Sequence, residues 1–387
     1  GLYRDVFFIA KNEIFITDPI LENKTAGGGI FVRYPEVSAE RAAIEVKTHI
    51  RNTGNQPAGV TIVHQLLDGD ALILEQETPV QALGARADHH VTASFEVLDP
   101  LLWSPRSPNL YSLVTQIYTE GKLKDADTTR IGIKSIAFEN NQLVLNGEIM
   151  FLRGVNRHQE YPYVGYALSN EAQFREAIKI KEAGFDYVRL SHYPHSPAFM
   201  DACDEIGLLV IDAILGWQYY SDDPAFQDHV YGTCRDLIRR DRNHACVLAW
   251  EVSLNESWMP ETFIDSLTAI AHLEYPGNQC FTAGWQEYGY DIYLQARQHR
   301  LQHYSPPEKP YVVSEYGDWE YYAKNAGLDQ DAWQDLQQEE RSSRQLLANG
   351  EERLLQQARN IQEAHNDNFN TPAFADGYWV MFDYNRG

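Results

Sequence analysis

Two glutamates follow short apolar segments of this 387-residue chain. The apolar run at 247–250 has the length and bulk of a buried strand, and Asn255 and Glu256 come shortly after it. The run at 311–313 is followed in the same way by Glu315. A carboxylate at the mouth of a buried strand costs free energy unless a partner or a reaction uses it. Two carboxylates that face each other suit the cleavage of a glycosidic bond, in which one serves as general acid and base and the other as nucleophile.

A strand-then-helix rhythm begins near residue 137 and would position these glutamates. Segment 170–183 carries an apolar helical stripe, with Asn170 and Gln173 spaced as a capping box and Gly184 at its C-terminal end. The polar segment 329–363 is expected to form a helix before the last strand. Eight such repeats over about 250 residues predict a (β/α)8 TIM barrel. The eight strand candidates are 151–155, 187–190, 208–211, 247–250, 280–283, 292–294, 311–313 and 378–382.

The chain before residue 137 lacks this rhythm and contains short segments separated by turn residues. Segments 91–97 and 111–118 alternate apolar and polar residues, which is typical of half-buried strands. Several such strands without helical periodicity predict an antiparallel β-sandwich. Segments 6–9 and 14–16 are also expected to be strands. The fold class is therefore multidomain, with a β-sandwich followed by the barrel.

In a TIM barrel the active site lies at the carboxyl ends of the strands, so the residues there are the functional candidates. Each candidate also has a plainer interpretation. Glu256 could favour the dipole of a following helix, Glu315 could form an ordinary ion pair, and His158 and His192 could be structural. Residues 242–244 precede the fourth strand, at the end of the barrel that serves stability, and are expected to be structural. The strand-end residues are Asn156, Arg157, His158, Arg189, His192, Tyr193, Asp212, Asn255, Glu256, Glu315, Tyr316 and Asp383.

The composition and net charge of the chain indicate which kinds of molecule it is not expected to bind. The formal net charge of −23 disfavours nucleic acid, which proteins bind through Lys and Arg. No apolar run approaches the roughly 18 residues of a membrane-spanning helix, so no membrane partner is expected. The four cysteines are widely spaced and indicate neither a disulfide framework nor a zinc site. The 8 Trp and 23 Tyr suit the stacking of sugars, although aromatic residues also fill cores.

Five motifs, in matching order, resemble those of the β-galactosidases of glycoside hydrolase family 2. Residues 1–6 resemble the last strand of that family's jelly-roll domain. The resemblance implies a C-terminal remnant of a jelly-roll sugar-binding domain at 1–25, an immunoglobulin-like β-sandwich at 26–136 and a catalytic TIM barrel at 137–387. We therefore expect a fragment that lacks the rest of the jelly roll and any part of the protein beyond the barrel. The motifs lie at 154–158, 188–194, 240–244, 255–257 and 314–316.

The resemblance also implies roles for individual residues. Glu315 matches the nucleophile and Glu256 the acid and base of a retaining exo-β-glycosidase that acts on an oligosaccharide or other glycoside. Arg189 matches an arginine that hydrogen-bonds the nucleophile, and its charge would keep Glu315 ionised and oriented. The implied substrate-binding residues are Asn255 at the 2-hydroxyl, His158 and His192 at the glycon, Trp379 beneath the glycon, and Tyr293 as a hydrogen-bond donor to the nucleophile.

Three departures from the family pattern alter these expectations. Well-known members carry Asp-Glu-Ala-Asn-Ile-Glu-x-His after the third strand and bind magnesium there, whereas this chain has no such Glu and His at 212–218, so we predict no metal. The family's Glu-Tyr-Ala-His becomes Glu-Tyr-Gly-Asp here, which either places Asp318 near the 6-position of the sugar or moves that contact to another residue. The segment 250–256 is one residue longer than in the best-known members, which predicts a bulge at the mouth of the fourth strand.

The resemblance leaves two alternatives open. The first is another glycon, such as a β-glucuronide, β-mannoside or arabinopyranoside, although the chain has no clear counterpart of the Asn-x-Lys carboxylate reader of the family's glucuronidases. The second is a non-catalytic carbohydrate-binding protein, which the presence of both glutamates disfavours. No cofactor is expected, a homo-oligomer is possible, and a periplasmic or secreted location is favoured over a cytoplasmic one by resemblance alone.

Overall fold

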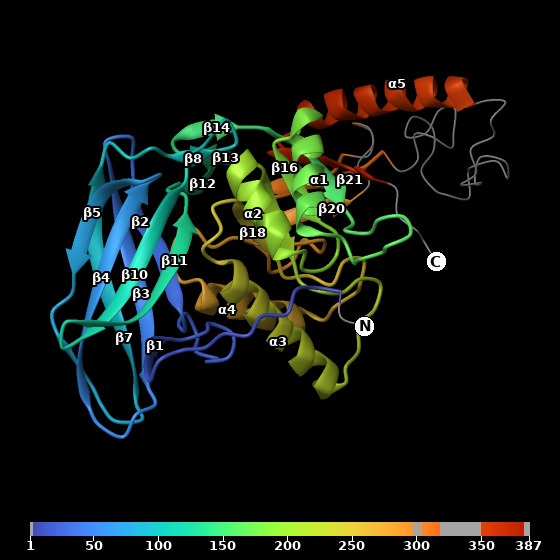
Figure 1. Ribbon diagram of the computed structural model, residues 1–387. Helices are drawn as coiled ribbons and strands as arrows, with labels where there is room; N and C mark the ends of the chain where they lie inside the picture. Colours follow the sequence, from blue (N-terminus) through green and yellow to red (C-terminus); the bar gives the residue numbers. More distant parts are fainter. Residues whose placement is uncertain (1–2, 297–300, 302–303, 318–349, 383–387) are drawn as a thin grey trace.

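The computed structural model describes residues 3–296, 301, 304–317 and 350–382. The chain forms a β-sandwich and a closed parallel barrel that lie side by side (Figure 1). The predicted fold class is confirmed. Among the described residues, no helix combines the length and the apolar character needed to cross a membrane.

The sandwich consists of two antiparallel sheets whose inward side chains form one core. Burial alternates along the strands: Ile44 and Val46 of one sheet and Ile62 and Leu66 of the other are buried between the sheets. This alternation is the period-2 pattern of strands with one face in the core. The first sheet contains β1 (Ile14–Ile16), β2 (Ile30–Val37), β3 (Arg41–Asn52) and β7 (Asp88–Leu98); the second contains β4 (Ala58–Asp68), β5 (Ala71–Glu77), β6 (Gln81–Leu83), β10 (Tyr111–Thr119) and β11 (Lys122–Ile131).

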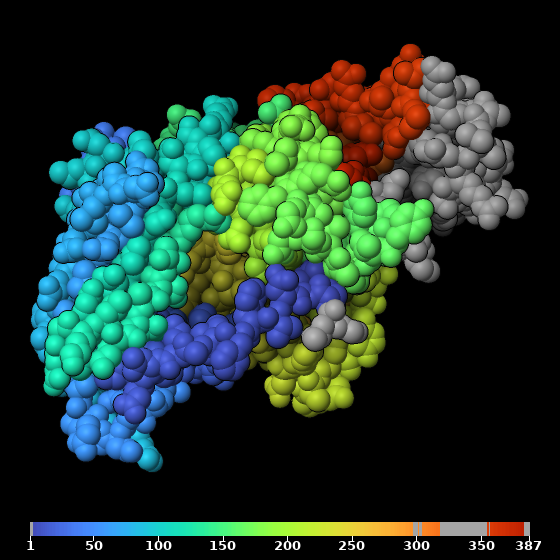
Figure 2. Space-filling view, in the orientation of Figure 1, coloured from blue at the N-terminus to red at the C-terminus, as the bar shows by residue number. Residues whose placement is uncertain are grey.

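The N-terminal segment is only partly a strand. β1 confirms the expectation for 14–16, and it pairs antiparallel with β3 in the sandwich. The expected strand at 6–9 is wrong: these residues are exposed and carry no strand pairing. A strand needs a neighbour for its backbone hydrogen bonds, and four apolar residues in a row do not provide one. Figure 2 shows this segment running across the surface from the sandwich toward the barrel, and the Lys11–Asp125 ion pair of 2.9 Å ties it to β11.

A small three-stranded sheet and a short ribbon connect the sandwich to the barrel. Trp103 of the ribbon is fully buried in the barrel's core cluster, and its indole N–H donates to the carbonyl of Asp204 at 2.8 Å. The two domains are therefore packed together through a shared core and not only through a linker. The ribbon is β8 (Trp103–Ser104) with β9 (Ser107–Pro108), and the sheet is β12 (Ile136–Glu139), β13 (Gln142–Leu145) and β14 (Glu148–Met150).

The barrel closes with eight parallel strands, as predicted. The last strand begins earlier than expected and ends at Tyr378, so Trp379 follows it. The segment 375–377 lacks apolar bulk because Asp376 is buried against His365 and Gly377 makes room for the hydroxyl of Tyr187. Its strand character was therefore not visible in the sequence. The strands are β15 (Leu152–Arg157), β16 (Tyr187–Leu190), β17 (Leu209–Ala213), β18 (Val247–Glu251), β19 (Thr282–Gly284), β20 (Ile292–Ala296), β21 (Tyr311–Tyr316) and β22 (Ala375–Tyr378).

The described helices cover the outside of the barrel (Figure 1). The helix expected at 170–183 is present, but its N-cap is Ser169, whose hydroxyl accepts from the N–H of Ala172, and not Asn170. Of the segment 329–363, only the part from 350 onward lies within the described residues, and it is helical. The helices are α1 (Asn170–Glu182), α2 (Pro197–Ile206), α3 (Pro224–Asp241), α4 (Glu261–Glu274) and α5 (Gly350–Phe369).

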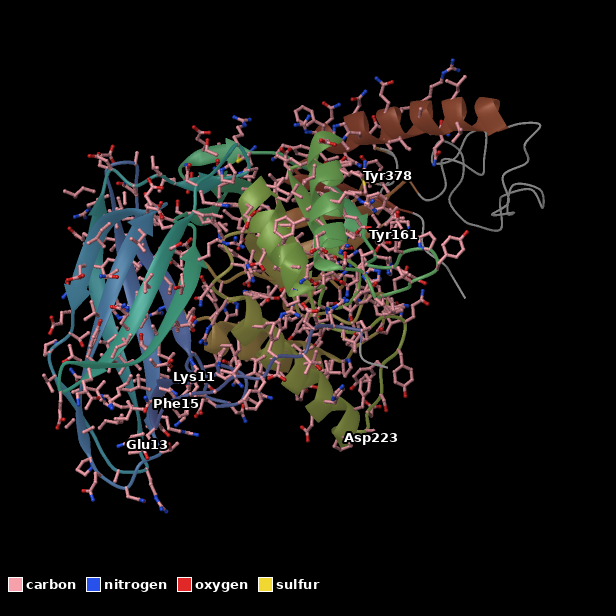
Figure 3. The ribbon with its side chains drawn as sticks, viewed as in Figure 1. Lys11, Glu13, Phe15, Tyr161, Asp223 and Tyr378 are labelled. Atoms are coloured by element: carbon pink, nitrogen blue, oxygen red, sulfur yellow. The ribbon has the colours of Figure 1, made fainter. Side chains whose placement is uncertain are left out.

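The residues expected to be structural, 242–244, hold the barrel to the sandwich. Arg242 donates to the carbonyls of Gly27 and Gly28 and lies over the ring of Phe31 at 4.4 Å. Asn243 accepts from the Val32 N–H and donates to the Ile30 carbonyl. These contacts fix the amino ends of the barrel strands on the sandwich. The carboxyl ends open away from it, and Figure 3 shows Tyr161 and Asp223, on loops after β15 and β17, on that side.

Candidate active site

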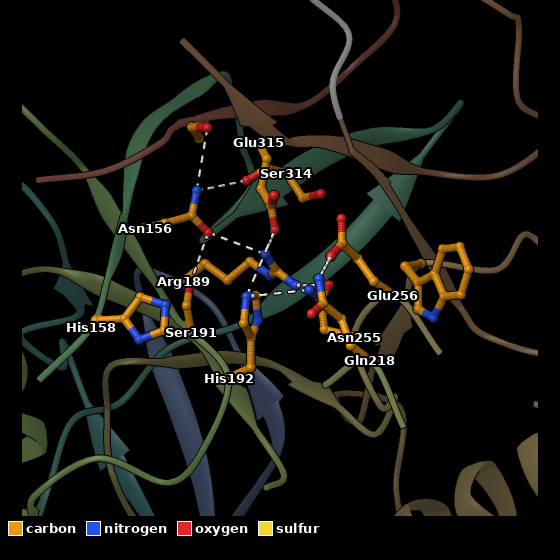
Figure 4. A network of polar contacts seen from close by, with 12 residues as sticks. Asn156, His158, Arg189, Ser191, His192, Gln218, Asn255, Glu256, Ser314 and Glu315 are labelled. Atoms are coloured by element: carbon orange, nitrogen blue, oxygen red, sulfur yellow. Dashed lines mark hydrogen bonds and ion pairs between the residues drawn. The ribbon is translucent and has the colours of Figure 1, made fainter. Parts of the chain in front are cut away.

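The site is organised around Arg189, a fully buried side chain of β16. Its guanidinium donates to Glu315 Oε1 at 2.8 Å and to Asn255 Oδ1 at 2.9 Å. It also donates to Asn156 Oδ1 at 3.2 Å and makes a two-point contact with Glu251 at 2.7 and 2.5 Å. Figure 4 shows the contacts of Arg189 with Asn156, Asn255 and Glu315. With Glu251, the network joins side chains from four different strands or their following loops. One cation therefore sets the positions of most polar groups at the mouth.

Glu315 lies near the end of β21 with only 6% of its surface exposed. A buried carboxylate is tolerated where a cation and a hydrogen bond compensate its charge, and Arg189 supplies both. His192 Nε2 lies 3.9 Å from the same carboxylate oxygen. The arrangement stabilises an ionised, oriented Glu315, as the sequence-based assignment of a nucleophile requires.

Glu251 is a buried carboxylate that sequence reasoning missed. The expected strand ended at Trp250, but β18 continues to Glu251. Side chains alternate along a strand: Trp250 packs outward against the cluster of α3 and α4, so Glu251 points to the barrel interior. There it makes the two-point contact with Arg189, the strongest geometry available to this pair of groups. The sequence signal that could have revealed it is its place directly after the apolar run at 247–250.

Glu256 lies in the loop between β18 and α4 and is partly exposed. Its Oε2 accepts a hydrogen bond of 2.6 Å from Gln218 Nε2, on the loop after β17. The bulge predicted between 250 and 256 is not formed in the sheet, because β18 stays paired with β17 and β19 as far as Glu251. The irregular pairing of β18 lies near the start of that strand, at Val247. The local distortion is instead in the loop, where Glu256 has a left-handed backbone with φ of 51°.

Three rings of the predicted glycon site meet at the mouth. His192 stacks on Trp379 with ring centres 5.6 Å apart and an interplanar angle of 10°, and His158 meets Trp379 edge-on at 5.4 Å. Trp217 lies 6.2 Å from His192 and 6.5 Å from His158. Its position is set by the loop after β17. Tyr193 completes the group, with its hydroxyl 3.3 Å from His158 Nδ1.

His192 is neutral at ordinary pH. Burial lowers its pKa well below the usual value, and the charges of Arg189 and His158 lower it further. Its Nε2 lies 3.2 Å from the amide nitrogen of Asn255, while its Nδ1 has no hydrogen-bond partner within the described part of the chain. An imidazole whose Nε2 accepts from an amide carries its proton on Nδ1. His192 is therefore a candidate hydrogen-bond donor for a bound hydroxyl group.

The structure does not bring every predicted residue to this site. Tyr293 packs against Tyr311 and Val313 in a cluster that includes residues of α5, outside the barrel interior. Asp318 and the strand-end candidate Asp383 lie outside the described residues. Asp212 lies beside Asp241 of α3, where burial raises its pKa well above the usual value and the charge of Asp241 raises it further.

The loop after the third barrel strand, where well-known members of the resembled family bind magnesium, lies beside Glu256 but does not fit that ion. Magnesium requires several oxygen ligands, but Gln218 directs an N–H group at Glu256. Among the described residues, the groups of side chains close enough to share an ion lie elsewhere, at Asp204, His244 and Cys246 and at Glu22, His49 and Asp88. Asp204 already accepts from Cys246 N–H at 2.7 Å and contacts His244 Nδ1 at 2.7 Å, so we assign no metal there.

Comparison with protein families gives two matches that divide the chain as the structure does. Residues 29–134 match the model "Glycosyl hydrolases family 2" and residues 136–371 match "Glycosyl hydrolases family 2, TIM barrel domain". A β-galactosidase of Thermoanaerobacter pseudethanolicus is 31% identical over 275 residues, which are 70% of this chain and 35% of the relative. One of Thermoanaerobacterium thermosulfurigenes is 30% identical over 280 residues, 72% of this chain and 37% of the relative. The chain thus spans just over a third of these relatives.

Solved structures share the fold over nearly the whole chain. A β-glucuronidase of Bacteroides uniformis superposes with a TM-score of 0.77 at 21% identity, covering 97% of this chain and 47% of that one. A putative β-galactosidase of Bacteroides fragilis gives a TM-score of 0.78 at 21% identity, covering 97% and 57%. With the sandwich, the barrel and both family models in agreement, the chain belongs to glycosyl hydrolase family 2.

Proposed function

We propose that the chain carries the catalytic site of a retaining exo-β-galactosidase, which releases terminal β-D-galactosyl residues with Glu315 as nucleophile and Glu256 as acid and base. The observation that carries this proposal is the Arg189 network: it holds Glu315 buried beside a cation, while Glu256 stands in the more open loop that follows Asn255. These are the different environments that a nucleophile and a proton donor need.

In the first step the Glu315 carboxylate attacks the anomeric carbon and the bond from that carbon to the leaving oxygen breaks. Glu256 gives its proton to that oxygen, so the alcohol leaves neutral. The product is a glycosyl ester on Glu315. Arg189 keeps Glu315 Oε1 in place before the attack, which limits the motion needed to reach the reacting carbon.

In the second step water attacks the anomeric carbon of the ester. Glu256, now a carboxylate, takes a proton from the water as the carbon–oxygen bond to Glu315 breaks. The sugar leaves with its original anomeric configuration, because two inversions have occurred. Glu315 returns to the carboxylate form that Arg189 stabilises, and Glu256 is protonated again for the next cycle.

The aromatic group at the mouth supports binding of a sugar ring. Trp379 and Trp217 belong to the group of rings around His158 and His192, and aromatic rings suit the C–H side of a pyranose, while His192 Nδ1 supplies a donor for a hydroxyl. Asn255, held by Arg189, is assigned to the 2-hydroxyl by its match to the family motif. Galactose is the proposed glycon because the sequence relatives are called β-galactosidases.

The central test is covalent trapping of the nucleophile. An activated 2-deoxy-2-fluoro-β-galactoside reacts in the first step, and its fluorine slows the second. We expect mass spectrometry to find one fluorogalactosyl group on the peptide that contains Glu315, and none on the Glu315→Gln variant. Labelling of another residue, or hydrolysis at wild-type rates by Glu315→Gln, would contradict the assignment.

The glycon is tested separately with a panel of nitrophenyl β-glycosides. We expect the galactoside to give the highest kcat/KM, with the glucuronide, mannoside and arabinopyranoside lower by at least roughly tenfold, since pocket contacts of this kind are worth about 1–3 kcal/mol. Proton NMR of the first product should show the β-anomer. A preference for the glucuronide would change the proposed glycon but not the proposed mechanism. Release of the α-anomer as the first product would reject the retaining mechanism.

A further inference from the structure

The loops after β17 and β18 are joined by backbone hydrogen bonds. Asn255 N–H donates to the Gly216 carbonyl at 3.0 Å, and Gln218 N–H donates to the Asn255 carbonyl at 2.8 Å. Trp217 and Asn255 form a parallel bridge between the loops. One residue further on, Tyr219 N–H donates to the hydroxyl of Ser257 at 2.9 Å. The two loops therefore have a fixed register relative to each other.

This register places Gln218 against Glu256. Both residues have left-handed backbones, with φ of 55° for Gln218 and 51° for Glu256. Such a conformation costs a non-glycine residue free energy and persists where the surroundings hold it in place. Here the backbone bridge holds both residues, and their side chains meet at 2.6 Å. The backbone register thus brings the two residues together, and the hydrogen bond joins the exposed side chain of Gln218 to the partly exposed side chain of Glu256.

The contact is also selective for one oxygen. Gln218 Nε2 donates to Glu256 Oε2, and an amide nitrogen has no acceptor capacity. Protonated Glu256 has two forms. If the proton is on Oε2, its O–H faces the N–H group of Gln218; if the proton is on Oε1, Oε2 is the carbonyl oxygen and still accepts the hydrogen bond from Gln218. The amide therefore favours the form that carries the proton on Oε1.

We propose that Gln218 is a positioning residue for Glu256. Gln218 holds Oε2 of Glu256, so that Oε1 of Glu256 carries the proton to the leaving oxygen. This inference rests on the proposed role of Glu256 as the acid and base. In the first step the O–H of Oε1 breaks and the proton goes to the leaving oxygen. In the second step Oε1 takes the proton from water, while Gln218 keeps its hydrogen bond to Oε2 throughout. Gln218 itself gives up no proton.

The test compares leaving groups that need a proton with one that does not. We expect Gln218→Ala to lower kcat/KM for methyl β-galactoside roughly 10-fold or more, because part of the 10²- to 10⁴-fold effect of a general acid is lost with its orientation. For 2,4-dinitrophenyl β-galactoside, whose leaving group departs without protonation, the first step should change less than about 3-fold. Gln218→Met, with a similar length, no charge and no N–H donor, should reproduce the loss.

A double-mutant cycle separates positioning from a merely structural role. In the Glu256→Ala background there is no carboxylate to orient, so adding Gln218→Ala should change the rate on either substrate by less than about 2-fold. Tyr219→Phe is the matched control, since it keeps the backbone contact to Ser257 and should act as wild type on both substrates.

Results that contradict the positioning role differ from results that contradict the proposed function. Equal losses on both substrates, or an undiminished effect of Gln218→Ala in the Glu256→Ala background, would overturn the positioning role. Wild-type rates in both Gln218 variants would overturn it as well. Failure of the proposed function has another signature: Glu256→Ala itself would then show no greater loss on the methyl glycoside than on the dinitrophenyl glycoside.

Discussion

The two ends of the barrel carry the same kinds of side chain and use them differently. At the amino end, Arg242 and Asn243 form their hydrogen bonds with backbone groups of the sandwich. At the carboxyl end, Arg189 faces the two carboxylates Glu251 and Glu315, and His192 Nδ1 has no partner in the described part of the chain. The arginine at the amino end therefore joins two domains through backbone carbonyls, whereas the arginine at the carboxyl end holds two buried carboxylates in place.

The histidines show the difference most clearly. At the carboxyl end, burial and the nearby cations keep the pKa of His192 low. At the amino end, burial also lowers the pKa of His244, but the charge and hydrogen bond of Asp204 outweigh it and raise the pKa to about 9. Both rings are largely buried. The sign of the neighbouring charge therefore decides whether each is a cation or a neutral ring.

Replacement of Arg189 should have the largest effect. Arg189→Met leaves Glu251 and Glu315 buried without a cation, and breaking a buried ion pair in this way costs about 3–5 kcal/mol of unfolding free energy. Hydrolysis by the folded fraction should fall by roughly 10³-fold, because Glu315 is no longer held. Urea unfolding and kcat/KM measure the two effects. Activity within tenfold of wild type would show that the carboxyl end is not organised around this cation.

The matched change at the amino end is Arg242→Met. It leaves the carbonyls of Gly27 and Gly28 unpaired and should cost about 2–4 kcal/mol of unfolding free energy. Since the contact lies at the opposite end from Glu315, kcat/KM of the folded protein should stay within about twofold. A selective loss of activity without a loss of stability would remove the distinction between the two ends.

The pH dependence of stability should separate the two histidines. The folded-state pKa of His244 is raised from 6.5 to about 9, so its contribution is complete below pH 6.5 and is lost as the pH rises to about 9. We expect the stability difference between wild type and His244→Gln to shrink by about 3 kcal/mol across that window. His192, with its lowered pKa, has the opposite sign: its contribution is complete above pH 6.5 and is lost as the pH falls below that value. If the stability difference between wild type and His244→Gln did not change with pH, His244 would not be a cation in the folded protein.

The smallest expected effect is that of Glu251→Gln. The amide oxygen can still accept one Arg189 hydrogen bond, but the second contact is lost. We expect kcat to fall roughly 10- to 30-fold, about 1.4–2 kcal/mol, with KM little changed, since Glu251 is in contact with Arg189 and not with the site of attack. A rise in KM at constant kcat would instead indicate that Glu251 contributes to substrate binding.

Local patterns were sufficient for most of the fold and for the two catalytic candidates. Apolar runs of strand length, helix caps and turn residues are properties of neighbouring residues, so the eight-stranded barrel and the sandwich could be predicted. Glu256 and Glu315 follow such apolar runs. Arg189 and His192 belong to a motif of neighbouring residues, which is also a local feature of the sequence. Where the local signal was weak, as in 375–377, the predicted strand was misplaced.

Contacts between distant segments were not predictable in this way. The inward direction of Glu251 depends on the outward packing of Trp250, and the pairing of Gln218 with Glu256 depends on the register of two loops about 38 positions apart. The residue order alone identified the candidate groups for the proposed chemistry, because their types and spacing are local. Folding in three dimensions decided which of them meet and which stay neutral, because these depend on neighbours that the barrel brings together only when it closes.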